Sequence, residues 1–274
     1  ATRAELHYLR TAETHICRNA MSGMHEANRM GWDAVSPHWQ AMIEERVDWR
    51  KCPSDPTIAL SRQELQHLGD VSGKDVVVLG SGDNQVAFAL AGMGARVTSL
   101  DISPKQLDTA AERAVEIGLE IAFVRADVVD LSSLGEGSFD LAYTGGHVAV
   151  WVSDLKTYYS EACRILRTGG MLMISEYHPF RRIWQDSSSD LRLAFTYFDR
   201  GPHEYDRSED VPDTPAGSLP SFEFHWTVSD YVSALMDTGC QLLAIDEFGD
   251  EPQCWEGAPM EGLPSHLLLV GRKR

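Results

Sequence analysis

The sequence is poor in basic residues and has no long apolar run. Lys and Arg total 24 against 41 Asp and Glu, which gives a formal net charge of −17 at pH 7. A polyanionic partner would meet a repulsive field, so we expect neither nucleic acid nor an anionic membrane as a partner. The chain also contains no stretch close to the roughly 18 consecutive apolar residues of a membrane-spanning helix.

Paired cysteine motifs are absent too. The cysteines are odd in number, far apart and form no C-x-x-C pair, so the sequence predicts neither a disulfide framework nor a zinc or other metal site. The N-terminus shows no basic-then-apolar signal segment. We therefore expect a reducing, cytoplasmic location. The five cysteines are Cys17, Cys52, Cys163, Cys240 and Cys254.

What the chain does contain is a regular alternation of strand and helix patterns after residue 70. Four strand-helix steps favour an α/β fold with a doubly wound, mostly parallel sheet. The last two strand patterns can pair as an antiparallel hairpin. Strands are expected at 76–79, 96–100, 121–124, 139–143, 171–177, 242–245 and 267–270, and helices at 104–117, 154–166 and 229–236.

Two regions lie outside this alternation. Residues 1–70 are expected to form an N-terminal cap whose amphipathic patterns predict three helices, ahead of a main domain at 71–274. Residues 179–226 form an insertion with two aromatic segments around a polar loop, which predicts a lid-like hairpin. Trp32 and Asn28 of the cap can either close over a ligand or pack the cap onto the sheet.

A glycine-rich turn between the first two strand patterns points to a nucleoside ligand. Gly80 and Gly82 allow a tight turn and close approach of the backbone to a ligand, and Asp101, 21 positions after Gly80, can accept the two hydroxyls of a ribose. A dinucleotide fingerprint would have a third glycine where Gln85 stands. Asp83 at the helix start would repel phosphate but suits a cationic or zwitterionic ligand, which favours a nucleoside with an amino-acid arm.

Beyond VVVLGSGDN at 76–84, the chain carries RADVVDL, SFDLAYTGG, ACRILRTGGMLMISEYHPF and, near the end, SDYVSALMDTGCQLLAIDEF and LPSHLLLVGRK. With these motifs it resembles the class I S-adenosylmethionine-dependent methyltransferases, and more narrowly the type 11-like bacterial small-molecule methyltransferases. The resemblance implies a Rossmann-like, seven-stranded sheet with an antiparallel last strand and S-adenosyl-L-methionine as cofactor. The sequence departs from the family pattern at Val78, where an acid is common, and at Asn84, where a third glycine is common.

The resemblance also assigns site residues. Gly80 and Gly82 would pass beside the methionine part of the cofactor, Asp101 would hold the ribose, and Ile102 would pack on the adenine ring. The cofactor-binding set that follows is Gly80, Ser81, Gly82, Asn84, Asp101, Ile102, Asp127, Val128, Thr144, Gly145 and Trp32.

Methyl transfer needs mainly alignment of acceptor and methyl group, and a base only for acceptors such as phenols or alcohols. His147 and His178 follow strand patterns at the ligand-binding edge and are the predicted catalytic residues, His147 first. We expect methylation of an O or N atom of a small molecule, with a role in secondary metabolism, by a monomer or homodimer. A non-catalytic S-adenosylmethionine-binding protein and an NAD-dependent oxidoreductase are the alternatives, and the acceptor stays open.

Overall fold

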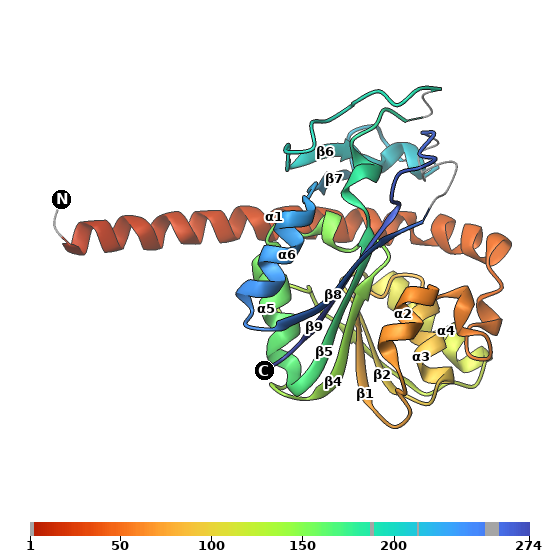
Figure 1. The fold of residues 1–274 in the computed structure, drawn as a ribbon. Helices are drawn as coiled ribbons and strands as arrows, with labels where there is room; N and C mark the ends of the chain where they lie inside the picture. The colour runs from red at the N-terminus through yellow and green to blue at the C-terminus, as the bar shows by residue number, and fades with distance from the viewer. Residues whose placement is uncertain (1–2, 187–188, 213, 250–257) are drawn as a thin grey trace.

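The computed structural model describes residues 3–186, 189–212, 214–249 and 258–274. The strands of its main sheet are β1 (Asp75–Leu79), β2 (Arg96–Asp101), β3 (Ile121–Arg125), β4 (Phe139–Gly145), β5 (Leu166–Tyr177), β8 (Gln241–Phe248) and β9 (His266–Arg272). They form a seven-stranded sheet in the order β3-β2-β1-β4-β5-β9-β8 (Figure 1). The first five are parallel, and β9 runs antiparallel to both neighbours. The predicted fold class is confirmed.

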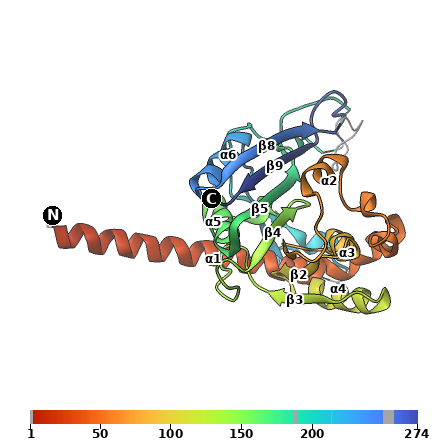
Figure 2. The ribbon, with the colours of Figure 1, turned by 60° about the horizontal axis from the view of Figure 1, so that its bottom comes forward.

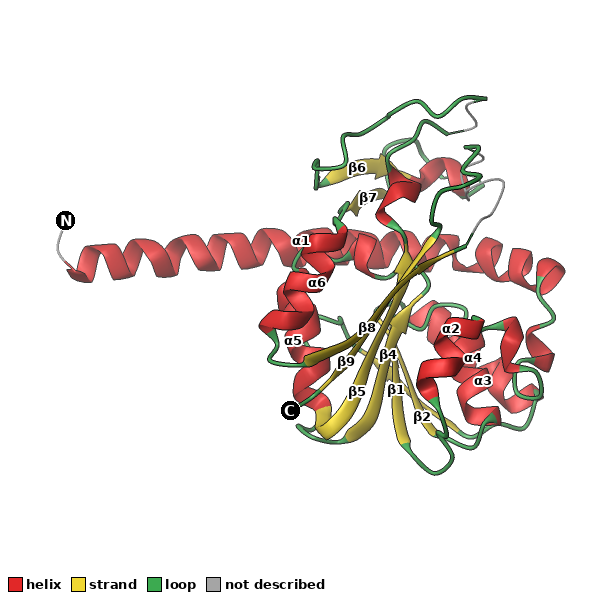
Figure 3. Ribbon diagram, viewed as in Figure 1, coloured by secondary structure: helices red, strands yellow, loops and turns green. Residues whose placement is uncertain are grey.

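Helices cover both faces of this sheet (Figure 3). One face carries α2 (Arg62–Leu68), α3 (Gln85–Gly92) and α4 (Pro104–Glu116), and the other carries α5 (Leu155–Ile165) and α6 (Val228–Asp237). Strand β1 is buried on both of its sides. Val76 and Val78 belong to the core of the first face, whereas Val77 and Leu79 belong to the core of the second. A strand buried on both faces reads as a continuous hydrophobic run. Short 3-10 helices are η1 (Trp49–Lys51), η2 (Pro56–Ile58), η3 (Ala149–Trp151), η4 (Pro179–Arg182) and η5 (Arg207–Asp210).

The N-terminal cap begins with one long helix, and the expectation of three separate helices was wrong. Helix α1 (Arg3–Arg46) is 44 residues long and contains Pro37. A proline inside a helix removes a backbone donor and crowds a carbonyl, at a cost of about 3 kcal/mol. Burial of Val35 and Ile43 beside it offsets this cost. The helix crosses above the carboxyl ends of the strands, and its N-terminal part extends beyond the body (Figures 1 and 2).

The insertion lies above α1 and contains the predicted hairpin, at different residues from those expected. Strand β6 (His203–Asp206) pairs antiparallel with β7 (Pro220–Glu223). The aromatic segment at 195–198 forms bends and a turn instead of a strand. Asn28 of α1 fixes the hairpin in place, because its side chain donates to Phe222 O at 2.9 Å and accepts from Phe222 N at 2.7 Å.

Two further expectations concern thiols and membranes. Cys163 and Cys240, far apart in sequence, are buried with their Sγ atoms 2.9 Å apart, so the cysteines are less scattered than the sequence indicates. Within the described ranges, none of the helices has the length and apolar character needed to cross a bilayer. The same residues contain no group of three or more His, Cys, Asp and Glu side chains arranged to hold a metal ion.

Candidate active site

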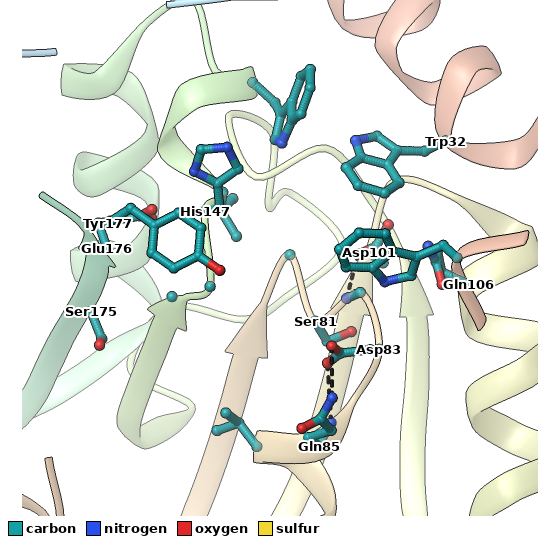
Figure 4. Close-up of a pocket in the computed structure, with 18 of the residues that line it drawn as sticks. Trp32, Ser81, Asp83, Gln85, Asp101, Gln106, His147, Ser175, Glu176 and Tyr177 are labelled. Carbon is teal, nitrogen blue, oxygen red and sulfur yellow. Dashed lines mark hydrogen bonds between the residues drawn. The ribbon is translucent and has the colours of Figure 1, made fainter. Parts of the chain in front are cut away.

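A cleft of about 1250 Å³ opens at the carboxyl edge of the sheet. Its floor is the turn after β1 and the loops after β2 to β5, and α1 and the insertion contribute to its walls. Figure 4 shows two groups of side chains in it: Ser81, Asp101 and Trp32 on one side, His147 and Tyr177 on the other. We call these the turn side and the insertion side.

The glycine turn is held in a left-handed backbone conformation. Gly80 has φ +63°, and a Cβ there would lie 2.6 Å from Val148 Cγ2, so a larger residue does not fit. Asn84 has φ 65° and begins α3, as its tolerance of this conformation predicts. Its side-chain amide donates to Gly82 O at 2.8 Å and accepts from Ser99 Oγ. Asn84 therefore stabilises the glycine turn through these two hydrogen bonds.

Asp101 ends β2 and is held by backbone amides. Its Oδ2 accepts from Gly82 N and its Oδ1 from Ser103 N, both at 2.8 Å. Burial raises the pKa of this carboxyl, while these amides act in the opposite direction. Each carboxylate oxygen can accept more than one hydrogen bond. The side chain is thus fixed beside the glycine turn with capacity left for two hydroxyl groups.

Asp83 is the second acid of the turn side. Its carboxylate accepts from Gln85 Nε2 at 2.9 Å, as drawn in Figure 4. Burial raises the pKa of Asp83 to about 6. A carboxyl group that is costly to ionise in isolation is stabilised in its charged form by a nearby cation. The site therefore fits a ligand with a positive group at the start of α3.

Asp127 follows β3 and is bound by α1. His25 Nδ1 donates to Asp127 Oδ2 at 2.6 Å. The other ring nitrogen of His25 accepts from Ser153 N at 3.0 Å, which fixes the ring proton on Nδ1. Asp127, one of the predicted cofactor-binding residues, is therefore at the cleft, and one of its oxygens is already paired with the cap.

Tryptophans form the wall between the two sides. Trp32 of α1 packs edge-to-face against Trp39, with ring centroids 5.9 Å apart, and against Trp151, at 5.5 Å. Trp32 lines the cleft. Trp32 thus packs the cap onto the segment after β4 and also faces the open space, and its closure over a ligand stays a prediction. Asn28 also reaches the cleft, but its amide is committed to Trp151 O and to the β7 backbone.

His147 follows β4 on the insertion side and has φ 83°, a conformation uncommon for residues other than glycine. Its Nε2 is paired with the Arg182 guanidinium, and its ring lies 4.8 Å from that of Tyr177. Burial, followed by the charges of Arg182 and Arg181, lowers the pKa of His147 well below its usual value. The imidazole is thus neutral, and its Nε2 lone pair is occupied.

Glu176 lies beneath the loop that carries His147. It is 2% exposed and accepts from Ala149 N at 3.1 Å. Burial raises its pKa to about 8, against the opposing effect of backbone amides from Ala149, His147 and Val148. Glu176 therefore positions the loop after β4 and is protonated over much of the neutral range.

His178 is placed differently from His147. It caps η4 by accepting from Phe180 N at 3.2 Å, and its Nε2 lies 2.7 Å from Glu247 Oε1. The side chain is 1% exposed and is not among the described residues that line the cleft. Its position is that of a structural cap, and its predicted role as a base gains no support from the geometry.

The structure brings most predicted site residues to the cleft. Those that line it are Trp32, Gly80, Ser81, Gly82, Asp101, Ile102, Asp127, Val128, Gly145 and His147. Asn84, Thr144 and His178 lie behind this lining; the Thr144 hydroxyl is buried against the Tyr158 hydroxyl.

Several lining residues were not predicted from the sequence. Tyr143 donates to Glu64 Oε1 at 2.5 Å, and both line the cleft together with Gln106. On the insertion side the cleft is lined by Arg182, Arg207 and Glu223. Its position at the carboxyl end of a predicted strand could have indicated Tyr143. The arginines belong to an insertion without periodicity, and nothing in the local sequence marks them.

Comparison with known proteins is consistent with this geometry. A family model described as a methyltransferase domain matches residues 77–174. The ubiquinone biosynthesis O-methyltransferase of Xanthomonas oryzae pv. oryzae is 29% identical over 156 residues, which are 56% of this chain and 65% of that protein. The chain thus matches just under two thirds of the length of that relative. An uncharacterized methyltransferase of Bacillus subtilis is 28% identical over 234 residues, 80% of this chain and 88% of that protein.

Solved structures show the same architecture. The crystal structure of an S-adenosylmethionine-dependent methyltransferase from Mesorhizobium loti has a TM-score of 0.56 and 26% identity, covering 76% of this chain and 94% of that chain. A methyltransferase structure from Methanosarcina mazei has a TM-score of 0.58 and 19% identity, covering 78% of this chain and 98% of that chain. At that lower identity the second comparison concerns the fold alone.

Proposed function

Because this chain belongs, through residues 77–174, to the class I, type 11-like S-adenosylmethionine-dependent methyltransferases, we propose that it transfers a methyl group from S-adenosylmethionine to an O or N atom of a small molecule. The observation that carries the proposal is the pair Asp101 and Gly82 at the sheet edge, a fixed carboxylate beside a glycine turn. A cytoplasmic protein acting in secondary metabolism, as a monomer or homodimer, is part of this proposal.

The turn side fits the cofactor. Asp101 would accept the ribose hydroxyls, and Ile102 and Val128 line the space beside it, where the adenine would lie. Asp83 would face the positive amino-acid arm. Bound there, S-adenosylmethionine supplies a methyl group already activated by the sulfonium charge. The protein then has to hold the acceptor atom in line with that group.

The insertion side would receive the acceptor. His147 is neutral, the form of imidazole that can take a proton from a phenol or alcohol. Since Arg182 holds its Nε2, proton transfer to that atom requires the guanidinium to move to another acceptor. An amine acceptor that arrives neutral needs no such step. In either case His147 and Tyr177 present their rings to the acceptor.

The test begins with calorimetric titration of S-adenosylmethionine, S-adenosylhomocysteine and NAD. Binding of the first two without NAD supports the proposal, and binding of NAD alone would show an oxidoreductase. Transfer of label from methyl-labelled cofactor to a panel of small phenols, amines and heterocycles then separates an enzyme from a binding protein. A protein that binds the cofactor and labels no acceptor in such panels would contradict the catalytic part.

A further inference from the structure

The insertion side of the cleft carries two arginines, Arg182 and Arg207, in a protein of net charge −17. Arg182 and Arg207 line it, and together with Arg181 and His225 they lower the pKa of His147 after the larger effect of burial. Acidic side chains also line this side, namely Asp186, Asp206, Glu209, Asp210 and Glu223. The partners of each arginine therefore decide whether it can bind an anionic ligand.

Arg207 is held in an unusual position for an arginine. Its guanidinium carbon lies 4.4 Å from the centroid of the Trp32 ring and 5.5 Å from that of Trp151. The side chain is 14% exposed, and its Nη1 is buried without a hydrogen-bond partner. Its nearest ion pair, to Asp210, is 3.5 Å long. A buried guanidinium with an unmet donor is costly unless a ligand completes it.

The acids on the same side of the cleft leave the Nη1 donor of Arg207 unpaired. Glu223 Oε2 lies 3.5 Å from both Arg182 Nη1 and His225 Nε2, and it is itself buried without a hydrogen bond. Asp206 is committed to Ser208 and to the Gly217 amide. Asp210 is 56% exposed. The remaining acids that line the cleft near the insertion are Asp186 and Glu209.

We propose that the methyl acceptor is an aromatic carboxylic acid whose carboxylate is bound by Arg207 and Arg182. A guanidinium offers paired donors that match a carboxylate in a two-pronged arrangement, and a partly desolvated site strengthens such a pair. The rings of Trp151, Tyr177 and His147 line the adjacent space and suit a flat acceptor. This inference rests on the proposed function and names the class of its substrate.

The test uses binding, so that it does not depend on finding the true acceptor. With S-adenosylhomocysteine saturating the protein, 4-hydroxybenzoate and the neutral, equally shaped 4-hydroxybenzamide are titrated by calorimetry. The acid is expected to bind at least about tenfold more tightly than the amide. Arg207→Gln should remove this preference by weakening the acid alone, and Arg207→Lys should retain part of it. Arg192→Gln, an exposed arginine paired with Asp190, is the matched control and should change nothing.

Three results would overturn the inference: equal binding of acid and amide, no binding of the acid to the complex, or a loss of S-adenosylhomocysteine affinity in Arg207→Gln. The last would assign Arg207 to the carboxylate of the cofactor. Thermal midpoints of the variants separate these results from misfolding. If S-adenosylhomocysteine does not bind to the wild-type protein, the proposed function itself fails, which is distinct from a complex that ignores the acid.

Discussion

The two sides of the cleft are built on different principles. On the turn side, short loops directly after the strands satisfy their own polar groups: Asp101 is held by two backbone amides and Asn84 by its own turn. On the insertion side, side chains come from the loop after β4 and from β5, η4, η5 and β7. Arg207, Glu223 and His225 keep buried atoms there without hydrogen-bond partners. The comparison indicates that the turn side is ready for one fixed ligand, whereas the insertion side is completed by the ligand it receives.

Asp101 provides the most direct test of this difference between the two sides of the cleft. Asp101→Ala should weaken S-adenosylhomocysteine binding by roughly 1–3 kcal/mol, because it leaves two ribose hydroxyls and two backbone amides unpaired. Calorimetry measures this, with Asp108→Ala on the exposed face of α4 as the control. Unchanged affinity would remove Asp101 from the ribose role and make the turn side no better defined than the insertion side.

Glu176 offers a test of how the loop between the two sides is held. Burial raises its pKa to about 8 in the folded protein, so the stability it contributes is present at low pH and is lost as pH rises through 8. From pH 6 to pH 9, wild type should lose roughly 2 kcal/mol of unfolding free energy relative to Glu176→Gln, which stays neutral. Urea unfolding at several pH values measures the difference. Parallel pH profiles would show that Glu176 ionises without cost in the folded protein.

His147 tests whether the insertion side does chemistry. His147→Asn keeps a residue that tolerates a positive φ but removes the imidazole. We expect label transfer to a phenolic acceptor to fall by roughly 100-fold, the lower end of the usual contribution of a general base, with cofactor affinity nearly intact. Turnover and calorimetry are measured on the same preparation. Full turnover would mean that positioning alone suffices, and a parallel loss of cofactor affinity would place His147 on the turn side.

The smallest expected effect concerns Asp83 and tests whether the turn side binds a cation. The pKa of Asp83 is raised to about 6, so its ionised fraction falls as pH drops from 7 to 5. Affinity for S-adenosylmethionine should decrease several-fold over this range in wild type and less in Asp83→Asn, since the amide carries no charge to lose. Binding isotherms at the two pH values provide the measurement. An identical pH dependence in both proteins would assign the effect to another group.

The difference between the sides also explains what the sequence could predict. Val76 to Leu79 form a strand buried on both faces, and Asp101 stands at a fixed spacing after Gly80; both are local patterns, and both were found. The prediction of three helices in the cap was wrong, because separate amphipathic patterns do not show that one helix joins them, and packing on the body carries α1 through Pro37. The pairing of His25 with Asp127, 102 positions apart, has no local signal. No local pattern marks Arg207 as a residue of the cleft either.

One face of α1 touches both sides of the cleft at once. His25 pairs with Asp127 beside the cofactor space, and Asn28, less than one helical turn further on, holds the hairpin of the insertion. A shift of Asp127 on cofactor binding would move this segment and, through Asn28, the backbone of β7. By thermodynamic reciprocity, any factor by which the cofactor changes acceptor affinity equals the factor by which the acceptor changes cofactor affinity. Two contacts on one face of α1 are thus a physical route by which the two binding equilibria can be coupled.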